Sequence, residues 1–132
     1  MHKTLSFLLA IAAGSVAAAP TALLQDYVAQ ARQTDPAFAP AASRGEAFFR
    51  QERATEAGRA TCAGCHTDDP RKEGRTRAHK AIAPLAPAVN PERLADKAKA
   101  EKWFERNCKD VLGRTCTAAE KADFTAWLIS IR

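Results

Sequence analysis

The sequence predicts an all-α fold in which a few amphipathic helices enclose a small core. Apolar residues recur every three or four positions along most of the chain, which is the spacing of a half-buried helix. Runs of valine and isoleucine, which would favour strands, are scarce. With 132 residues, the chain is long enough for one small domain with a modest core.

Two helices are expected in the first part of the chain. The first covers residues 21–33 and carries an apolar stripe. Residues 34–40 contain two prolines and are predicted to form a connector. The second helix covers residues 41–52, where Gly45 is expected to offer a flat spot on which a large side chain such as Trp127 could seat.

Two further helices are expected after a mostly irregular segment over residues 58–89. Asn90 is predicted to cap a helix that ends near Asn107, with a proline at its first position. Thr117 is predicted to cap the last helix, and Glu120 then completes a capping box.

Residues 1–18 are predicted to be a secretory signal peptide. A basic start precedes an apolar run over residues 5–16 and a stretch of alanines, and cleavage is expected after Ala18. The apolar run is too short to span a membrane, and a retained N-terminal anchor is the alternative. We therefore expect an exported, periplasmic protein that is not integral to the membrane after cleavage.

The charge pattern predicts an ordinary solvated surface. The formal net charge is +5, but acidic residues are interleaved with basic ones throughout the chain. This pattern does not favour a nucleic-acid-binding face, so no nucleic acid is expected as a partner. A specific acidic protein partner is the alternative to a merely solvated surface.

The segment from Cys62 to His66 has the C-x-x-C-H pattern of a c-type haem attachment site. Cys62 and Cys65 would bind two vinyl groups at one porphyrin edge, and His66 would ligate the iron. A redox dithiol is one alternative, but it is typical of a βαβ context that the sequence lacks. A zinc site would need two more ligands at suitable spacing, and a plain disulfide is the third alternative. The pattern predicts one covalently attached haem c.

The other two cysteines, Cys108 and Cys116, are predicted to form a disulfide. They close a small loop in a chain expected to be exported, where disulfides persist. A bridge of this size contributes about 2–3 kcal/mol to stability. A redox-active pair, or a thiolate ligand to the iron, is the alternative.

The second axial ligand of the iron is not expected to be methionine, because Met1 is the only one in the chain. Asn107 shares a helical stripe with Trp103 and Phe104, so it is expected to point into the core. A buried amide needs a polar partner, and the haem iron could be the partner of Asn107. Asn107 could instead simply end its helix. His79 is another candidate ligand, although it also suits a surface position. A different asparagine, a lysine, water or no ligand are the remaining candidates.

Several segments resemble the sphaeroides haem protein (SHP) family of class I-like monohaem cytochromes c. These are residues 82–87 (IAPLAP), 101–108 (EKWFERNC), 112–117 (LGRTCT) and 120–123 (EKAD). The resemblance runs from about residue 44 to about residue 129 and implies a class I cytochrome c-like fold around one covalent haem. In that fold the N- and C-terminal helices cross, and the residues that resemble the crossing are Gly45, Phe49, Phe124 and Trp127.

The resemblance also divides the chain into three parts. Residues 1–18 are the predicted signal peptide, and residues 19–40 are an N-terminal helix and connector that the resemblance does not cover. Residues 41–132 are the predicted cytochrome c domain.

The resemblance implies roles for individual residues. Asn107 matches the asparagine that is the sixth iron ligand in the family, next to Cys108, which is bridged to Cys116. Pro84 matches a proline whose carbonyl can hold the ring of the proximal histidine, and Trp103 belongs to the matching segment beside the cofactor. The family also implies two redox partners, a dihaem cytochrome c and a membrane cytochrome b, and chemistry with O2 or NO.

An amide oxygen is a hard, weak ligand that holds Fe(III) better than Fe(II), whereas methionine sulfur favours Fe(II). Reduction should therefore release Asn107 and open a position for a diatomic molecule such as O2, NO or CO. The alternative is a plain six-coordinate electron shuttle with His79 or a lysine as ligand. An enzymatic role, such as a nitric oxide dioxygenase or a peroxidase, is a third possibility. It has little support, because no distal acid–base residue is identifiable in the sequence.

Overall fold

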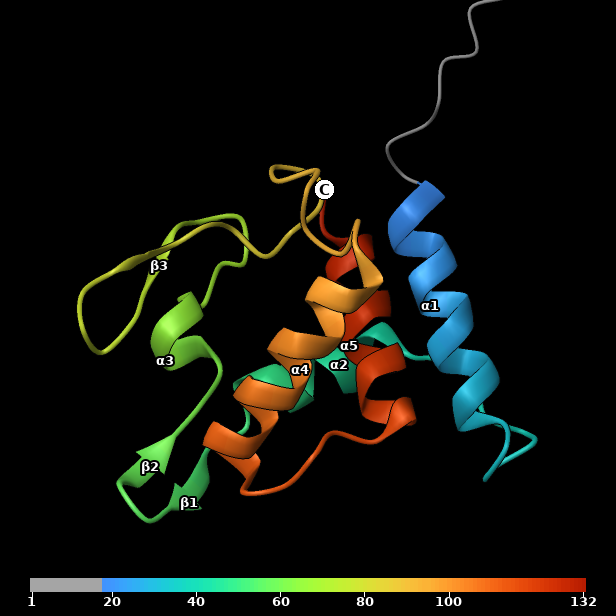
Figure 1. The fold of residues 1–132 in the computed structure, drawn as a ribbon, viewed down its shortest axis with the longest axis horizontal. Coiled ribbons are helices and arrows are strands. Elements are labelled where there is room, and N and C mark those ends of the chain that lie inside the picture. Colours follow the sequence, from blue (N-terminus) through green and yellow to red (C-terminus); the bar gives the residue numbers. More distant parts are fainter. Residues whose placement is uncertain (1–17) are drawn as a thin grey trace, which may run out of the picture.

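The computed structural model describes residues 18–132 and confirms a mostly helical chain (Figure 1). The helices are α1 (Ala18–Ala31), α2 (Ala42–Arg50), α3 (Ala63–His66), α4 (Lys97–Leu112) and α5 (Ala118–Ser130). Two antiparallel strand pairs accompany them: β1 (Arg53–Thr55) with β2 (Gly58–Ala60), and β3 (Gly74–Arg75) with β4 (Ala81–Ile82). The predicted signal peptide, apart from its last residue, lies outside the described residues. Within residues 18–132, no helix is long and apolar enough to cross a membrane.

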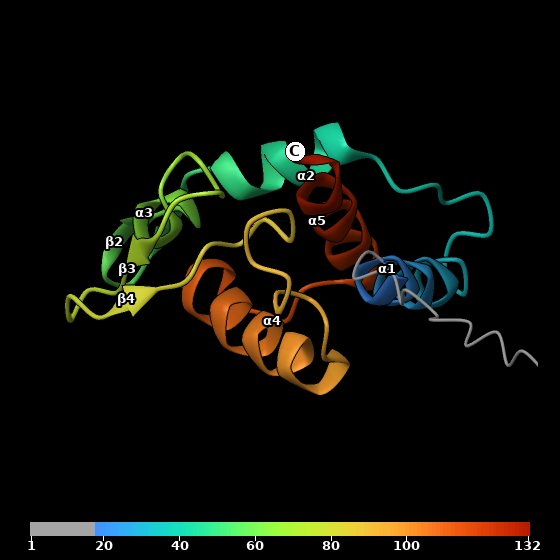
Figure 2. The ribbon, with the colours of Figure 1, turned by 90° about the horizontal axis from the view of Figure 1, so that it is seen from above.

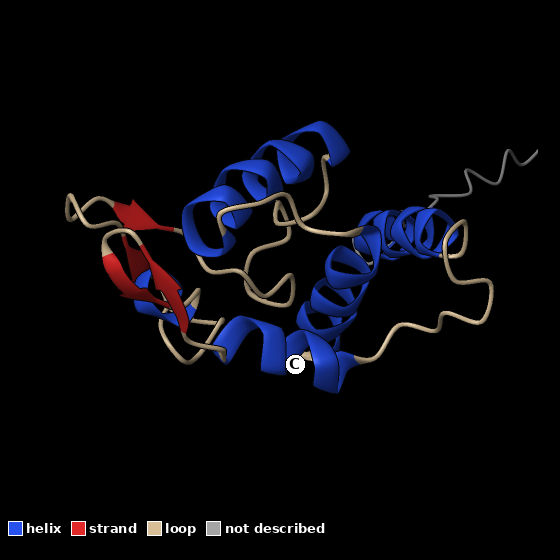
Figure 3. Cartoon of the chain, turned by 90° about the horizontal axis from the view of Figure 1, so that it is seen from below, coloured by secondary structure: helices blue, strands red, loops and turns tan. Residues whose placement is uncertain are grey.

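The elements are distributed between two ends of the molecule. The strands gather with α3 at one end and α1 lies at the other, with α2 and α5 crossing between them (Figures 2 and 3). Helix α4 runs along one side, and its C-terminal half approaches β1. The short strand pairs lie within or beside the segment that the sequence predicts to be mostly irregular.

Helices α2 and α5 cross at Gly45. A Cβ atom at this position would lie 2.9 Å from the Cα atom of Phe124 and would overlap the backbone of Asp123. Only glycine permits this approach. The crossing is as predicted, but the α5 backbone, and not the Trp127 side chain, seats on Gly45. Trp127 packs instead against Phe49, which lies one helical turn after Gly45 in α2, and the two ring centroids are 4.9 Å apart.

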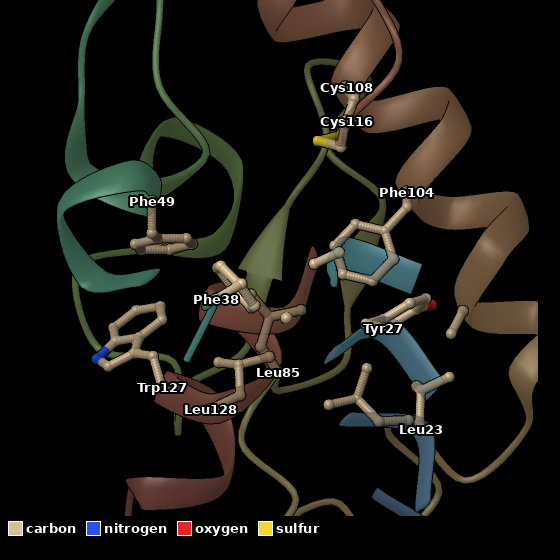
Figure 4. Close-up of a cluster of buried hydrophobic side chains, with 14 residues drawn as sticks. Leu23, Tyr27, Phe38, Phe49, Leu85, Phe104, Cys108, Cys116, Trp127 and Leu128 are labelled. Atoms are coloured by element: carbon tan, nitrogen blue, oxygen red, sulfur yellow. A yellow bond between two sulfur atoms is a disulfide. The ribbon is translucent and has the colours of Figure 1, made fainter. Parts of the chain in front are cut away.

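Aromatic rings connect four helices through the core, and Figure 4 shows those of Tyr27, Phe49, Phe104 and Trp127. Tyr27 of α1 is completely buried, and its ring meets Phe104 of α4 edge-on, with centroids 5.7 Å apart. Phe104 meets Phe124 of α5 edge-on at the same separation, and Phe124 stacks on Phe49 of α2 at 6.1 Å. Helix α1 is therefore part of the same hydrophobic core as the other helices.

Helix α4 does not begin at Asn90, as the sequence predicts, but at Lys97. Asn90 is engaged elsewhere: its side chain donates to the Pro84 carbonyl oxygen at 2.8 Å, and its backbone N–H donates to Ala86 at 3.1 Å. The cap is instead Asp96, whose carboxylate accepts the backbone N–H of Lys99 at 2.9 Å. The predicted cap is wrong because a longer-range contact takes the Asn90 side chain.

Helix α4 also continues further than predicted. It passes through Asn107 and Cys108 and ends at Gly113, which has a left-handed φ of 68°. Asn107 therefore lies inside the helix, and the interpretation in which it ends the helix is wrong. Cys108 is a helical residue, so the loop predicted to start there begins only at Gly113.

Helix α5 begins as predicted. The Thr117 hydroxyl accepts the backbone N–H of Glu120 at 3.2 Å, and the Glu120 carboxylate accepts the backbone N–H of Thr117 at 2.8 Å. The capping box is thus complete.

Candidate haem-binding site

The C-x-x-C-H segment forms one helical turn, α3. The backbone N–H of His66 donates to the Cys62 carbonyl oxygen at 3.1 Å, and the Thr61 hydroxyl accepts the N–H of Gly64 at 2.9 Å. This turn places Cys62, Cys65 and His66 on one helix face, since they are separated by three and four positions. Both cysteines are free thiols and are half-buried, so the structure gives no support to a disulfide between them.

The β3–β4 hairpin packs directly against this turn through Gly74. A Cβ atom on Gly74 would lie 2.9 Å from the His66 Cα atom and would overlap the Cys65 carbonyl oxygen. A side chain of any kind would therefore push the hairpin off the motif. The hairpin backbone and the C-x-x-C-H turn are therefore in direct contact at Gly74.

Burial favours the neutral forms of His66 and Cys62. Desolvation, with a smaller contribution from the positive charge of Arg93, lowers the pKa of His66 to about 4. Its imidazole is therefore neutral near pH 7, which is the form that ligates a metal. Desolvation likewise raises the pKa of Cys62, against the opposing charge of Arg53.

These residues fit a covalently held haem. Two free thiols and a neutral imidazole share one turn, which suits thioether attachment and proximal ligation. A zinc site is not supported, because no group of three His, Cys, Asp or Glu side chains within the described part of the chain could hold a metal ion. The donor set at α3 therefore favours the haem among the predicted alternatives.

Pro84 lies at the centre of a hydrogen-bonded clamp. Its carbonyl oxygen accepts two hydrogen bonds, from Asn90 Nδ2 at 2.8 Å and from Arg93 Nε at 3.1 Å. Arg93 also donates through Nη2 to the Ala83 carbonyl oxygen at 2.7 Å. A carbonyl oxygen has two lone pairs, so the atom predicted to hold the His66 ring already has two donors.

Asn107 and Trp103 lie on α4 beside its buried stripe. The residues that enter the core are Ala100, Phe104 and Cys108. Trp103 is 39% exposed and Asn107 is half-buried. The prediction that Trp103 points into the polypeptide core is therefore wrong, because the buried stripe runs one position away from it. The role of Trp103 and Asn107 beside a cofactor stays a prediction.

The structure joins Cys108 and Cys116, whose Cα atoms are 5.6 Å apart. Both cysteines are buried, and Cys108 follows Asn107 directly in α4. The pair thus ties the last turns of α4 to the start of α5. The position of Asn107 is fixed by this tie as well as by the helix.

His79 lies at the tip of the β3–β4 hairpin. It is exposed and has a left-handed φ of 59°. Its backbone N–H donates to the Thr76 carbonyl oxygen at 2.9 Å, which closes the turn. This placement agrees with the surface interpretation.

Two residues of the site have no clear signal in the sequence. Gly74 is one glycine within a polar stretch, and Arg93 is one of many basic residues. Each has a role only because another segment of the folded chain packs against it. Nothing in the neighbouring sequence distinguishes either residue from others of its type.

Comparisons with known proteins find one matching family model and similar c-type cytochromes. Residues 36–128 match a family model described as a domain of unknown function, DUF1924. The cytochrome c-type protein SHP of Cereibacter sphaeroides is 48% identical over 92 residues, which cover 68% of this chain and 71% of that protein.

Solved structures of two relatives are also similar. The crystal structure of oxidised cytochrome c'' from Methylophilus methylotrophus has a TM-score of 0.81 at 36% identity, covering 88% of this chain and 97% of that one. A solution structure of the same cytochrome, described as giving insights into haem-ligand detachment, has a TM-score of 0.76 at 37% identity over 85% of this chain and 93% of that one. Oxidised SHP, described as an oxygen-binding cytochrome c, has a TM-score of 0.76 at 43% identity over 85% and 96% of the two chains.

The family model spans both the C-x-x-C-H turn and α4 and extends across most of the described residues. With its C-x-x-C-H turn and its all-α fold, this chain belongs to the SHP family of c-type cytochromes.

Proposed function

We propose that this chain is an exported, periplasmic cytochrome that accepts an electron and then binds a diatomic molecule such as O2 or NO. One haem c would be attached through Cys62 and Cys65, with His66 and Asn107 as its two axial ligands. Such a haem would supply an iron that changes between ferric and ferrous states and binds diatomic molecules when ferrous. The role of Asn107 is to leave the iron on reduction.

The observation that carries the proposal is the placement of Asn107. It is held inside α4, half-buried, next to a cysteine that is bridged to the following segment. The part of α4 that carries it approaches β1, at the end of the molecule where α3 lies. An amide oxygen binds ferrous iron weakly, so the reduced state would release it.

The relatives support the gas-binding part of the proposal. SHP is described as an oxygen-binding cytochrome c, and cytochrome c'' is described in terms of haem-ligand detachment. A releasable ligand and an open ferrous position are two aspects of the same mechanism. The bridge between Cys108 and Cys116 would keep the released Asn107 close enough to return on oxidation.

The expected location and partners complete the proposal. The N-terminal signal peptide would direct the chain to the periplasm, where disulfides persist and haem c is attached. The electron would come from a dihaem cytochrome c, supplied in turn by a membrane cytochrome b.

Absorption spectra of the holoprotein test the proposal. The dithionite-reduced protein should be five-coordinate and high-spin, and its Soret band should shift at once on addition of CO. Asn107→Ala should turn the ferric spectrum from low-spin to high-spin. Lys102→Ala, an exposed change on the same helix, should leave both spectra unchanged.

A low-spin ferrous spectrum that does not respond to CO would contradict gas binding and would support the electron shuttle. An unchanged ferric spectrum in Asn107→Ala would remove Asn107 from the iron. His79→Ala would then test the other candidate ligand.

A further inference from the structure

The β3–β4 hairpin concentrates positive charge at the end of the molecule where α3 lies (Figures 1 and 2). Residues 72–82, which we call the basic hairpin, contain four cationic side chains and one carboxylate, whereas the whole chain has 20 basic and 15 acidic residues. The four cations are Lys72, Arg75, Arg77 and Lys80, and all of them are exposed. This segment is therefore much more basic than the chain as a whole.

Most of this charge has no counter-charge on the molecule itself. Arg75 lies 3.9 Å from Glu73, and both side chains are more than half exposed, so the pair contributes little. Among residues 18–132, no carboxylate lies within ion-pair distance of Lys72, Arg77 or Lys80. The basic hairpin therefore presents uncompensated positive charge to the solvent.

Hydrogen bonds fix the backbone that carries these cations. The backbone N–H of Thr76 donates to the Lys80 carbonyl oxygen at 2.9 Å, and the N–H of Lys80 donates to the Thr76 hydroxyl at 3.1 Å. The strands on either side of this turn pair in register, with Gly74 opposite Ile82. The cations are therefore held on a closed hairpin and not on an open loop.

The basic hairpin is in direct contact with the C-x-x-C-H turn. A Cβ atom on Gly74 would lie 2.9 Å from the Cα atom of His66, so the two backbones touch. A protein bound to the basic hairpin would therefore lie beside the turn that carries the proposed haem attachment. Electron transfer requires two cofactors to approach closely, and this face of the molecule meets that requirement better than the α1 end, which lies opposite (Figures 1 and 2).

The composition of the basic hairpin favours a protein partner over a membrane or a nucleic acid. The exposed large apolar side chains of the described residues are Val89 and Trp103, and neither belongs to the hairpin, so it has no such group to insert into a bilayer. It also contains no Phe, Tyr or Trp that could stack on bases. A small, exposed, charged surface suits the transient interface of an electron-transfer complex, whose formation is accelerated by opposite charge on the partner.

We propose that the basic hairpin is the docking surface for an acidic, soluble electron-donor protein. The donor is oxidised by one electron as the ferric haem becomes ferrous. The inference deepens the proposed function and rests on its haem site. It is separable from gas binding, because electron delivery can be measured with no gas present.

The experiment is the anaerobic reduction of the ferric holoprotein by flavodoxin hydroquinone, an acidic protein donor that becomes the semiquinone, in a stopped-flow instrument. At low ionic strength, Arg77→Gln with Lys80→Gln should lower the second-order rate constant roughly three- to tenfold. The difference should vanish near about 0.5 M salt, because salt screens the attraction. Lys72→Gln with Arg75→Gln should act in the same way and serves as a second variant. Arg77→Lys with Lys80→Arg retains the charge and should stay within about twofold of the wild type.

The matched control is Arg32→Gln with Lys99→Gln, which removes the same charge from the opposite end of the molecule. Both side chains are exposed. Arg32 follows α1, and Lys99 lies in the first turn of α4, where Lys97 pairs with Asp26 of α1 at 2.8 Å. The rate constant should change by less than about twofold, because these charges lie far from the docking surface. The neutral lumiflavin semiquinone should reduce all variants at equal rates, which would show that the haem itself is unaltered.

Three outcomes would overturn the inference. The first is an unchanged flavodoxin rate constant in both hairpin variants, with covalent haem verified by mass. The second is an equal fall in the control variant, which would assign the effect to net charge and not to the hairpin. The third is a hairpin variant that no longer sediments with phosphatidylserine vesicles although its flavodoxin rate is unchanged, which would assign the hairpin to a lipid surface.

The inference and the proposed function can fail separately. If the wild-type ferrous protein ignores CO while the hairpin variants are still reduced more slowly by flavodoxin, gas binding fails and the docking surface stands. If CO binds as proposed while the flavodoxin rate constants are equal, the docking surface fails and gas binding stands.

Discussion

At the scale of single residues, the attachment turn depends on a glycine outside the motif. Gly74 comes from the β3 strand and lets the hairpin backbone rest on Cys65 and His66. Gly64, inside the motif, has an open environment: a Cβ atom there would meet only the Thr61 hydroxyl, at 3.6 Å. Closeness in sequence to the cysteines is therefore a poor guide to which glycine is required.

Gly74→Ala should destabilise the ferric holoprotein by about 1–3 kcal/mol, the usual cost of overpacking a tight contact. Chemical denaturation followed by far-ultraviolet circular dichroism measures this free energy. Gly64→Ala is the matched control and should change stability by less than about 1 kcal/mol, because alanine suits a helix and the space is open. Equal stability of the two variants would show that the Gly74 contact is unimportant.

At the scale of elements, the start of α5 is specified by local chemistry and reinforced by a charge. Arg114 donates to both carboxylate oxygens of Glu120, at 2.9 and 2.6 Å, alongside the capping-box contacts to Thr117. These hydrogen bonds, with that of Arg114 the largest, lower the pKa of Glu120. The ionised carboxylate is therefore the form that the folded state prefers.

Glu120→Gln should be less stable than the wild type at pH 7, and this difference should shrink on acidification. The folded-state pKa lies below the unfolded value, so the contribution is full above about pH 4.3 and is lost as the pH falls through the folded value. Urea denaturation at about pH 7, 5 and 3 provides the measurement. The control is Glu92→Gln, an exposed glutamate without an ion pair in the described residues. A difference that does not change with pH would contradict the assignment.

At the scale of the whole molecule, the N-terminal helix is built into the core. Leu23 and Tyr27 of α1 are buried, and the Tyr27 ring contacts Phe104 on the helix that carries Asn107. Lys121 of α5 lies 5.5 Å above the Tyr27 ring and pairs with Glu101 of α4 at 2.7 Å. Helix α1 thus packs against both α4 and α5.

Tyr27→Ala should lower the free energy of unfolding by about 3–5 kcal/mol, because it leaves a large cavity between α1 and α4. Thermal or urea denaturation of the holoprotein measures the change. Gln25→Ala, on the exposed face of the same helix, should change stability by no more than about 0.5 kcal/mol. A loss below about 1 kcal/mol in Tyr27→Ala would mean that α1 is not part of the cooperative core.

Much of this protein can be predicted from local patterns in the sequence. The C-x-x-C-H segment, the helical periodicity and the Thr117 capping box each involve residues within a few positions of one another. These interactions depend only on neighbouring residues. The helical fold class and the C-x-x-C-H turn can therefore be predicted without knowledge of the tertiary structure. The family resemblance adds the expectation for Asn107, which local periodicity alone leaves undecided.

The tertiary structure decided what depends on contacts beyond a single helical turn. Asn90 has every local mark of a helix cap, yet its side chain bonds Pro84 and α4 begins at Lys97 instead. The spacing of Trp103 in its helix predicts a core position. In the structure Phe104, one position further along α4, is buried and Trp103 is exposed. The packing of Gly74 against Cys65 and His66 exists only in the folded chain. Short-range chemistry thus specifies the C-x-x-C-H turn, and packing between segments sets its surroundings, because burial is a property of assembled segments.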